Sequence, residues 1–228
     1  MPVWVGNNGE GADMPLERFG SAPLNGNEAI YGEGEPVANG TALDFWRWAY
    51  SDLCMNNVRG VFAEWLVARL LNLPQRLRDA WAECDLSTED GITIEVKAGA
   101  YLQAWHDQAS KPSLITFSRL RGRKWLPDNR YADQQTCNAD FYVFCVQIEI
   151  RASEWDAFNL SQWRFYVLSK AQVEAVGQGS MGLGRVRSMA RELTASEFRL
   201  TMGDALEEYR ARRLAANSPA SACVEAGR

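Results

Sequence analysis

Apolar and polar residues alternate most clearly from residue 92 to residue 97. Successive side chains of a strand point to opposite faces, so this alternation predicts a strand with one buried and one polar face. The Glu-Asp-Gly run at 89–91 precedes it, and Asp-Gly is a strong hairpin signal. A turn centred on Asp90 would place Asp85 opposite Glu95. The apolar face would carry Ile92, Ile94 and Val96, and the polar face Thr93, Glu95 and Lys97.

Apolar residues recur at helical spacing between Asn56 and Pro74. They fall on nearly every side, which predicts a largely buried helix that Pro74 stops. The only charged residues in this segment are Arg59, Glu64 and Arg69. An ionised carboxylate inside such a helix needs a cationic partner or a metal ion, because desolvating it alone is costly.

The remaining pattern predicts an α/β fold with a mixed central β-sheet flanked by helices. Runs at 140–150 and 163–168 are predominantly apolar and are typical of buried strands. Helices are expected over 41–51, 170–176 and 204–214, and a glycine-rich loop over 177–185. The predicted organisation is an irregular or flexible arm over 1–40, an α/β domain over 41–214 and a disordered tail over 215–228.

Composition excludes several classes of protein. The chain has 228 residues, of which 46% are hydrophobic, enough for one sizeable core. His106 is the only histidine, which argues against histidine-rich zinc sites and other chemistry that needs several histidines. The five cysteines contain no C-x-x-C pair and are typical of reduced thiols in a cytoplasmic protein. The first residues lack both a basic segment and an apolar run, and no later stretch has membrane-spanning length, so neither a leader nor a membrane partner is expected.

Four positions together resemble the PD-(D/E)xK nuclease superfamily. A helix carries Glu64, Asp85 stands before a hairpin, and Glu95 and Lys97 form a Glu-x-Lys on the next strand. The resemblance covers roughly residues 41 to 170, and it departs from the pattern at Cys84, where the proline that names the motif would stand. It implies a restriction endonuclease-like core and hydrolysis of phosphodiester bonds.

The resemblance also implies a role for each residue. Asp85 and Glu95 would hold one or two Mg²⁺ ions, with Mn²⁺ as a substitute, and the backbone carbonyl of Val96 would be a further ligand. Glu64 would bind a second ion or a coordinated water. Lys97 would orient the attacking water or stabilise negative charge on the phosphate.

Nucleic acid, with DNA preferred, is the expected partner, although the net charge of -5 argues against binding through bulk electrostatics. A short basic segment at 118–124 is suited to phosphate contacts, and as an isolated run it also fits a solvated loop. Gln103 and His106 follow the lysine and could reach a phosphate or a water. The residues expected to contact substrate are Gln103, His106, Arg119, Arg121, Arg123 and Lys124.

Simpler interpretations of the same residues remain open. Glu95 and Lys97 could form an exposed strand edge with Lys97 paired to Glu83 across the hairpin. Glu64 could be a solvated residue or a partner of Arg59 or Arg69. Asp79 is a rival for the aspartate role, but its place in the sequence is too far from the turn to face Glu95.

The sequence therefore favours a Mg²⁺-dependent deoxyribonuclease. A restriction-like endonuclease is expected ahead of an exonuclease or a junction resolvase, and a symmetric homodimer would let two sites cut both strands of a duplex. The alternative is a catalytically inactive nuclease-fold module that binds nucleic acid or a protein partner. A hydrolase for another phosphoester is a third possibility.

Overall fold

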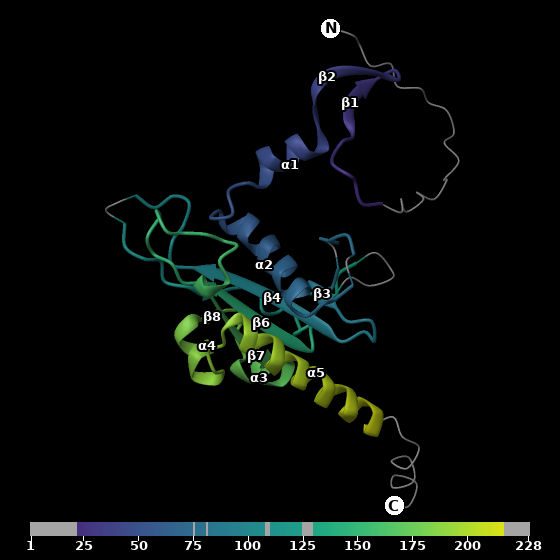
Figure 1. Ribbon diagram of the computed structural model, residues 1–228. Helices are drawn as coiled ribbons and strands as arrows, with labels where there is room; N and C mark the ends of the chain where they lie inside the picture. Colours follow the sequence, from purple (N-terminus) through teal and green to yellow (C-terminus); the bar gives the residue numbers. More distant parts are fainter. Residues whose placement is uncertain (1–21, 75, 81, 108–109, 125–129, 217–228) are drawn as a thin grey trace, which may run out of the picture.

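A four-stranded mixed sheet forms the centre of the protein (Figure 1). The computed structural model describes residues 22–74, 76–80, 82–107, 110–124 and 130–216. The strands lie in the order β3-β4-β6-β7; β4 and β6 are parallel, and the two outer pairs are antiparallel. Their bounds are β3 Leu86–Ser87, β4 Thr93–Ala100, β6 Phe141–Gln147 and β7 Trp163–Ser169. The predicted mixed sheet is thus confirmed.

Helices cover both faces of this sheet. On one face α2 (Asn56–Leu70) and α5 (Ala195–Ala216) pack against alternate residues of β4, β6 and β7 in a single apolar cluster. On the other face α3 (Lys170–Val176) and α4 (Leu183–Met189) join a second cluster. Every residue of β6 is buried, because both of its faces are covered. The prediction of a sheet flanked by helices is confirmed.

The predicted hairpin has the expected register. Leu86 lies opposite Ile94 and Ser87 opposite Thr93, so the paired residue numbers sum to 180 as a turn centred on Asp90 requires. The apolar side chains at positions 92, 94 and 96 are buried, as the alternation predicted. The alternative pairing of Lys97 with Glu83 is not found, since Glu83 forms an ion pair with Lys124 at 3.2 Å.

Local signals explain where the helices begin. Ser169 caps α3 in a reciprocal pair with Gln172, and the observed bounds equal the predicted ones. For α5 the prediction started nine residues too late. The Thr-Ala-Ser-Glu run at 194–197 forms the same kind of capping box, because Thr194 and Glu197 exchange hydrogen bonds between side chain and backbone.

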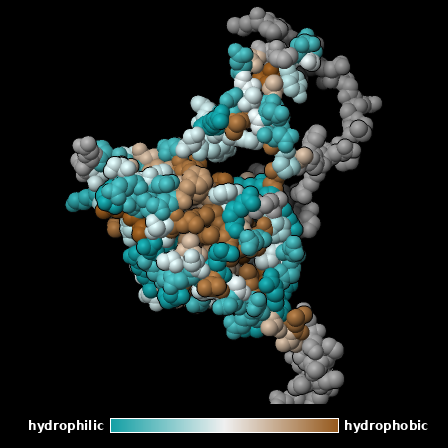
Figure 2. Space-filling model, viewed as in Figure 1, coloured by the Kyte–Doolittle hydropathy of each residue, from teal (hydrophilic) through white to brown (hydrophobic). Residues whose placement is uncertain are grey.

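Two expectations need correction, and a third is confirmed. Within the expected irregular arm, β1 (Ala29–Gly32) and β2 (Glu35–Thr41) form an antiparallel hairpin. The expected helix at 41–51 is confirmed as α1 (Ala42–Tyr50), which buries no residue and stands clear of the main body with the hairpin (Figure 2). The expected glycine-rich loop contains β8 (Met181–Gly182), which pairs with β5 (Thr116–Phe117), and the start of α4. A short helical turn, η1 (Leu160–Gln162), precedes β7.

Some calls lie outside the described residues. Positions 1–21 of the arm and 217–228 of the tail are among these, and Ala215 and Ala216 belong to α5 rather than to a tail. The four described cysteines, at 54, 84, 137 and 145, are free thiols as expected. Among the described helices none combines the length and the apolar character needed to cross a membrane.

Candidate functional site

The edge of β4 is open where the predicted site residues begin. β3 has only two residues, so it pairs with β4 no further than Ile94. Two residues later, the backbone N–H of Val96 donates to Asp85 Oδ2 at 2.7 Å, where a longer β3 would have supplied a carbonyl. The N–H and C=O of one strand residue point to the same edge, so the Val96 carbonyl also faces this opening. The carboxylate of Asp85 therefore replaces part of the sheet ladder.

All four residues of the resemblance line one cavity of about 890 Å³ at this open edge. Asp85 comes from the chain before β3, Glu95 and Lys97 from the polar face of β4, and Glu64 from the middle of α2. Val96 also lines the cavity. We call it the acidic cavity. Three segments that are separate in the sequence thus contribute side chains to one cavity.

Glu64 is held by a residue that the sequence analysis overlooked. Arg78 Nε donates to Glu64 Oε2 at 2.5 Å and Arg78 Nη2 to Oε1 at 2.9 Å, a bidentate contact. The expected alternatives, Arg59 and Arg69, do not make it, because residues five apart on a helix lie on different faces. This contact raises the pKa of Arg78, with Asp85 and Asp79 adding to it.

Glu95 and Lys97 form an ion pair within the cavity. The two residues lie two positions apart on the same face of β4. Lys97 Nζ donates to Glu95 Oε1 at 2.6 Å. Their side chains are only 18% and 17% exposed, so the interpretation as an exposed strand edge is wrong. Because the pair is partly buried, salt screens the attraction between its charges less than it screens that of a surface pair.

Asp85 is the most strongly perturbed acid of the cavity. Burial raises its pKa to about 7, and the nearby negative charges of Glu95 and Glu64 add to the rise. The Val96 N–H and the Lys97 ammonium oppose it. A carboxyl group whose pKa is raised by burial and by like charges is typical of functional sites. A bound cation would relieve both causes at once.

The described residues of the acidic cavity have the donor atoms of a metal site but not its geometry. The donors are carboxylate and carbonyl oxygens, which suit Mg²⁺ and Mn²⁺. Yet among the described residues no three His, Cys, Asp or Glu side chains are gathered so that they could hold one ion. The reason is visible in the two ion pairs, since Glu64 faces Arg78 and Glu95 faces Lys97. The oxygen donors therefore suit a magnesium ion, but Glu64 and Glu95 form ion pairs with basic side chains instead.

The basic segment borders the acidic cavity. Arg119, Arg121 and Arg123 line it, whereas Lys124 pairs with Glu83. Buried Leu120 anchors the segment, so the alternate arginines are held at the wall of the cavity. Arg121 Nε is buried and makes no hydrogen bond. Arg119, Arg123 and Lys124 are exposed, as expected for a solvated loop, whereas Leu120 is buried and Arg121 is half-buried.

Gln103 and His106 do not line the acidic cavity. The Gln103 side chain is buried; its Oε1 accepts from Arg59 and its Nε2 donates to the Ala100 carbonyl. His106 lies within hydrogen-bonding distance of Ser113 Oγ at 3.3 Å and faces a different cavity of about 460 Å³. Neither residue is therefore placed to contact a substrate at Asp85.

Asp79 lines the acidic cavity, but its position favours Asp85 for the aspartate role. Asp79 is exposed, whereas Asp85 is half-buried and fixed to β4 through Val96. Asn138 and Tyr142 also line the cavity and were not singled out from the sequence. Tyr142 belongs to an apolar strand, so nothing in its sequence setting marks it as more than a core residue.

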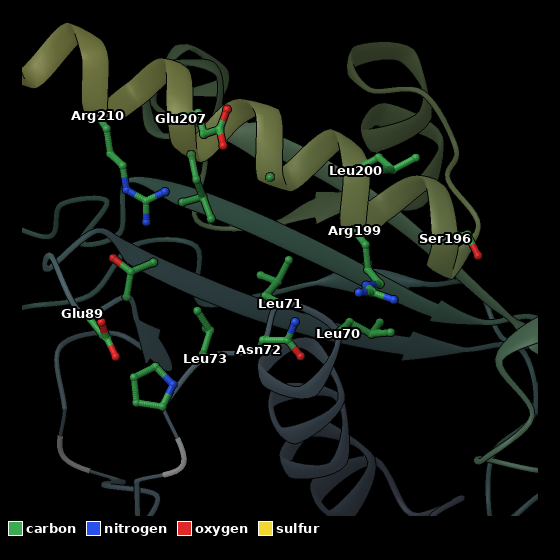
Figure 3. A pocket seen from close by; sticks show the side chains of 14 residues that line it. Leu70, Leu71, Asn72, Leu73, Glu89, Ser196, Arg199, Leu200, Glu207 and Arg210 are labelled. Carbon is green, nitrogen blue, oxygen red and sulfur yellow. The ribbon is translucent and has the colours of Figure 1, made fainter.

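A further cavity of about 710 Å³ lies between the end of α2 and α5 (Figure 3). Leu70, Leu71 and Leu200 are among its apolar lining residues. Arg210, at its rim, forms an ion pair with Asp90 at 2.9 Å. The cavity contains none of the predicted site residues.

Comparisons with known proteins do not add to this picture. No protein-family model matches the chain, and neither the curated proteins nor the solved structures gave a significant match.

Proposed function

We propose that this protein is a Mg²⁺-dependent deoxyribonuclease of the PD-(D/E)xK type with a restriction endonuclease-like core. The observation that carries the proposal is the convergence of Glu64, Asp85, Glu95 and Lys97 on one cavity at the open edge of a mixed sheet. These residues come from three segments. They bring together a half-buried acid with a raised pKa, two further carboxylates and a lysine, a combination that is typical of functional sites.

The residues divide into two groups by role. Asp85, Glu95 and the Val96 carbonyl would hold Mg²⁺, and Glu64 would hold a second ion or a coordinated water. Magnesium in such a site stabilises charge on the phosphate and lowers the pKa of a bound water. To bind metal, Glu64 would have to break its ion pair with Arg78. Glu95 would likewise have to break its ion pair with Lys97. That exchange frees the Lys97 ammonium to donate to the attacking water or to a phosphate oxygen.

The basic segment supplies the substrate contacts. Arg119, Arg121 and Arg123 border the acidic cavity, and guanidinium groups bind phosphate oxygens in a bidentate manner. These contacts would hold the backbone without reading its sequence. A strand bound along them would present a phosphodiester to Asp85 and Lys97. Cleavage of both strands of a duplex would require a second copy of the site, which a homodimer would provide.

A second function is favoured by one observation. Because Glu64 and Glu95 are already paired with cations, the chain could be a nuclease-fold module that binds nucleic acid or a protein partner without cleaving it. In that case the ion pairs stabilise the fold and no metal binds.

Nicking of supercoiled plasmid separates the two functions. We expect relaxed product with Mg²⁺ and none with EDTA, and loss of product in Lys97→Ala. The control is Lys111→Ala, which removes an equal charge from an exposed position that lines no cavity described above. A wild type that binds DNA but never relaxes it, with Mg²⁺ or Mn²⁺, would favour the binding module.

A further inference from the structure

Arg59 is a buried cation that has no carboxylate partner among the described residues. Its side chain is only 3% exposed. Nη1 donates to the Cys54 carbonyl at 2.7 Å and Nη2 to Gln103 Oε1 at 2.9 Å, while Nε makes no hydrogen bond. Arginine stays charged in proteins, so this charge is balanced by neutral oxygens alone. A buried charge without an opposite charge is unfavourable, and an anion would compensate it.

Arg59 lines a cavity of about 590 Å³, which we call the Arg59 cavity. Asn56 and Asn57, both exposed, line it from the first turn of α2. No side chain caps this helix, because its N-cap residue is Met55. The free N–H groups and the positive end of the helix dipole therefore add to the positive potential around Arg59. Such a combination favours an anion with several oxygens, such as phosphate.

The Arg59 cavity adjoins the acidic cavity. Val96, Lys97 and Arg119 line both, so the two spaces meet across the polar edge of β4. Trp105 lines the Arg59 cavity with 67% of its surface exposed. An exposed aromatic face beside a phosphate site is suited to stacking on a nucleobase. The arrangement therefore matches a strand whose phosphates pass from one cavity to the other.

We propose that the Arg59 cavity binds a phosphate group of the nucleic-acid strand whose cleavage takes place in the acidic cavity. The assignment to that strand rests on the proposed nuclease function, whereas the phosphate chemistry rests on Arg59 and the start of α2. The phosphate is either an internal phosphodiester or a terminal phosphate monoester. Both present oxygens to the same donors, and the experiment distinguishes them.

Asn57→Asp is the informative variant. It places a negative charge in the cavity, where it repels phosphate, and an acidic residue in the first turn also favours the helix dipole, so the fold is retained. Arg59→Gln removes the cation directly but also disturbs a buried residue. Asn159→Asp is the matched control, since it makes the same change at the exposed N-cap of η1, outside both cavities.

Binding is measured in EDTA by fluorescence anisotropy, so that no cleavage interferes. The probes are single-stranded oligonucleotides of one sequence with a 5′-phosphate, a 3′-phosphate or hydroxyls at both ends. We expect each variant to weaken binding about tenfold, because Asn57→Asp adds a repulsive charge and Arg59→Gln removes an attractive charge at one phosphate. Asn159→Asp should bind within about twofold of the wild type, because exposed charges far from the strand are screened.

The pattern over the probes identifies the source of the phosphate. Equal losses for all three oligonucleotides indicate an internal phosphodiester. Tighter wild-type binding of one phosphorylated end, lost in Asn57→Asp, indicates a terminal monoester. If Asn57→Asp binds every probe as well as Asn159→Asp does, the Arg59 cavity holds no phosphate and the proposal is overturned.

Separate assays distinguish failure of this proposal from failure of the nuclease function. Plasmid nicking that persists with unaltered oligonucleotide affinity in Asn57→Asp contradicts the phosphate site alone. Oligonucleotide binding that depends on Asn57 and Arg59, in a protein that never nicks, supports the phosphate site and contradicts the nuclease function. Should no oligonucleotide bind, inorganic phosphate is the probe: a rise in melting temperature in wild type but not in Asn57→Asp supports the site, and no rise overturns it.

Discussion

Asp85 and Val96 are joined across the end of a strand, with the Asp85 carboxylate accepting the Val96 N–H at 2.7 Å. One carboxylate oxygen thereby takes the place of a strand carbonyl at the edge of the sheet. Because the group is buried beside two further carboxylates, its ionised form is unfavourable in the metal-free protein. A cost to stability of this kind is common at functional sites.

Asp85→Asn should therefore stabilise the metal-free protein. The amide oxygen can still accept the Val96 N–H, and the unfavourable charge is removed. We expect the free energy of unfolding in EDTA at about pH 8 to rise by on the order of 1–2 kcal/mol. Urea titration measures it, with Asp204→Asn, at an exposed position of α5, as the control. A loss of stability equal to that of an ordinary buried-site substitution would contradict the account of Asp85.

The same group gives a pH dependence with a definite sign. The pKa of Asp85 is about 7 in the folded protein, against about 3.9 for an aspartate in an unfolded chain. Between these values the folded state binds more protons, so its Asp85 contribution to stability falls as pH rises. Metal binding requires the ionised form of Asp85, and a bound cation offsets the loss of stability that this charge causes.

We accordingly expect Mg²⁺ to raise the melting temperature more at about pH 8 than at about pH 6, because the ion competes with a proton below the folded-state pKa. Differential scanning fluorimetry with and without Mg²⁺ measures this difference. In Asp85→Asn the dependence on pH should be lost. An equal Mg²⁺ effect at both pH values in the wild type would contradict the assignment of Asp85 as a ligand.

Arg78→Gln should have opposite effects with and without metal. Without metal, Glu64 loses its bidentate partner and the protein is destabilised by about 1–3 kcal/mol. With metal, Glu64 no longer has to leave an arginine, so the Mg²⁺-induced rise in melting temperature should exceed that of the wild type.

Arg151→Gln is the matched control for Arg78→Gln. Arg151 contacts Glu149 through both Nε and Nη2, but it lies at the surface and outside the acidic cavity. Its replacement should leave the Mg²⁺ effect unchanged. If Arg78→Gln reduces the Mg²⁺ effect, Glu64 is not a ligand and Arg78 supports the site in another way.

Much of this fold could be predicted because local signals and tertiary packing agree. The alternation in β4, the Asp-Gly turn and the capping box of α3 each fix an element with short-range chemistry. β6 is recognisable because a strand covered on both faces is apolar throughout. The hairpin register and the bounds of α3 agree with the prediction, whereas β6 is shorter than the predicted run at 140–150.

The partners of charged residues could not be predicted in this way. Arg78 lies in a segment without periodicity, and only the tertiary structure brings it to Glu64. Arg59 was considered as a partner of Glu64, but their spacing puts them on different faces of α2, and Arg59 faces Gln103. The partners of long charged side chains often lie far apart in the sequence, so the spacing of neighbouring residues does not predict these pairs.

Two glycines test the packing independently of function. A Cβ at Gly99 of β4 would lie 2.5 Å from Ile115 Cγ2, and Phe117 is close behind it. Gly99→Ala should therefore lower the free energy of unfolding by about 1–3 kcal/mol. At Gly184 in α4 a Cβ meets nothing within 4 Å, so Gly184→Ala should raise it by up to about 1 kcal/mol through helix propensity. Equal effects in chemical denaturation would contradict the packing of β5 on β4.

The most direct test of the central claim is calorimetric titration with Mn²⁺ of wild type, Asp85→Ala and Asp79→Ala. Both aspartates line the acidic cavity, but only Asp85 is fixed to β4 beside Glu95. The account predicts Mn²⁺ binding in wild type and Asp79→Ala, and its loss in Asp85→Ala. A wild type that binds no Mn²⁺, or an Asp85→Ala variant that binds it as well as wild type does, would contradict the account.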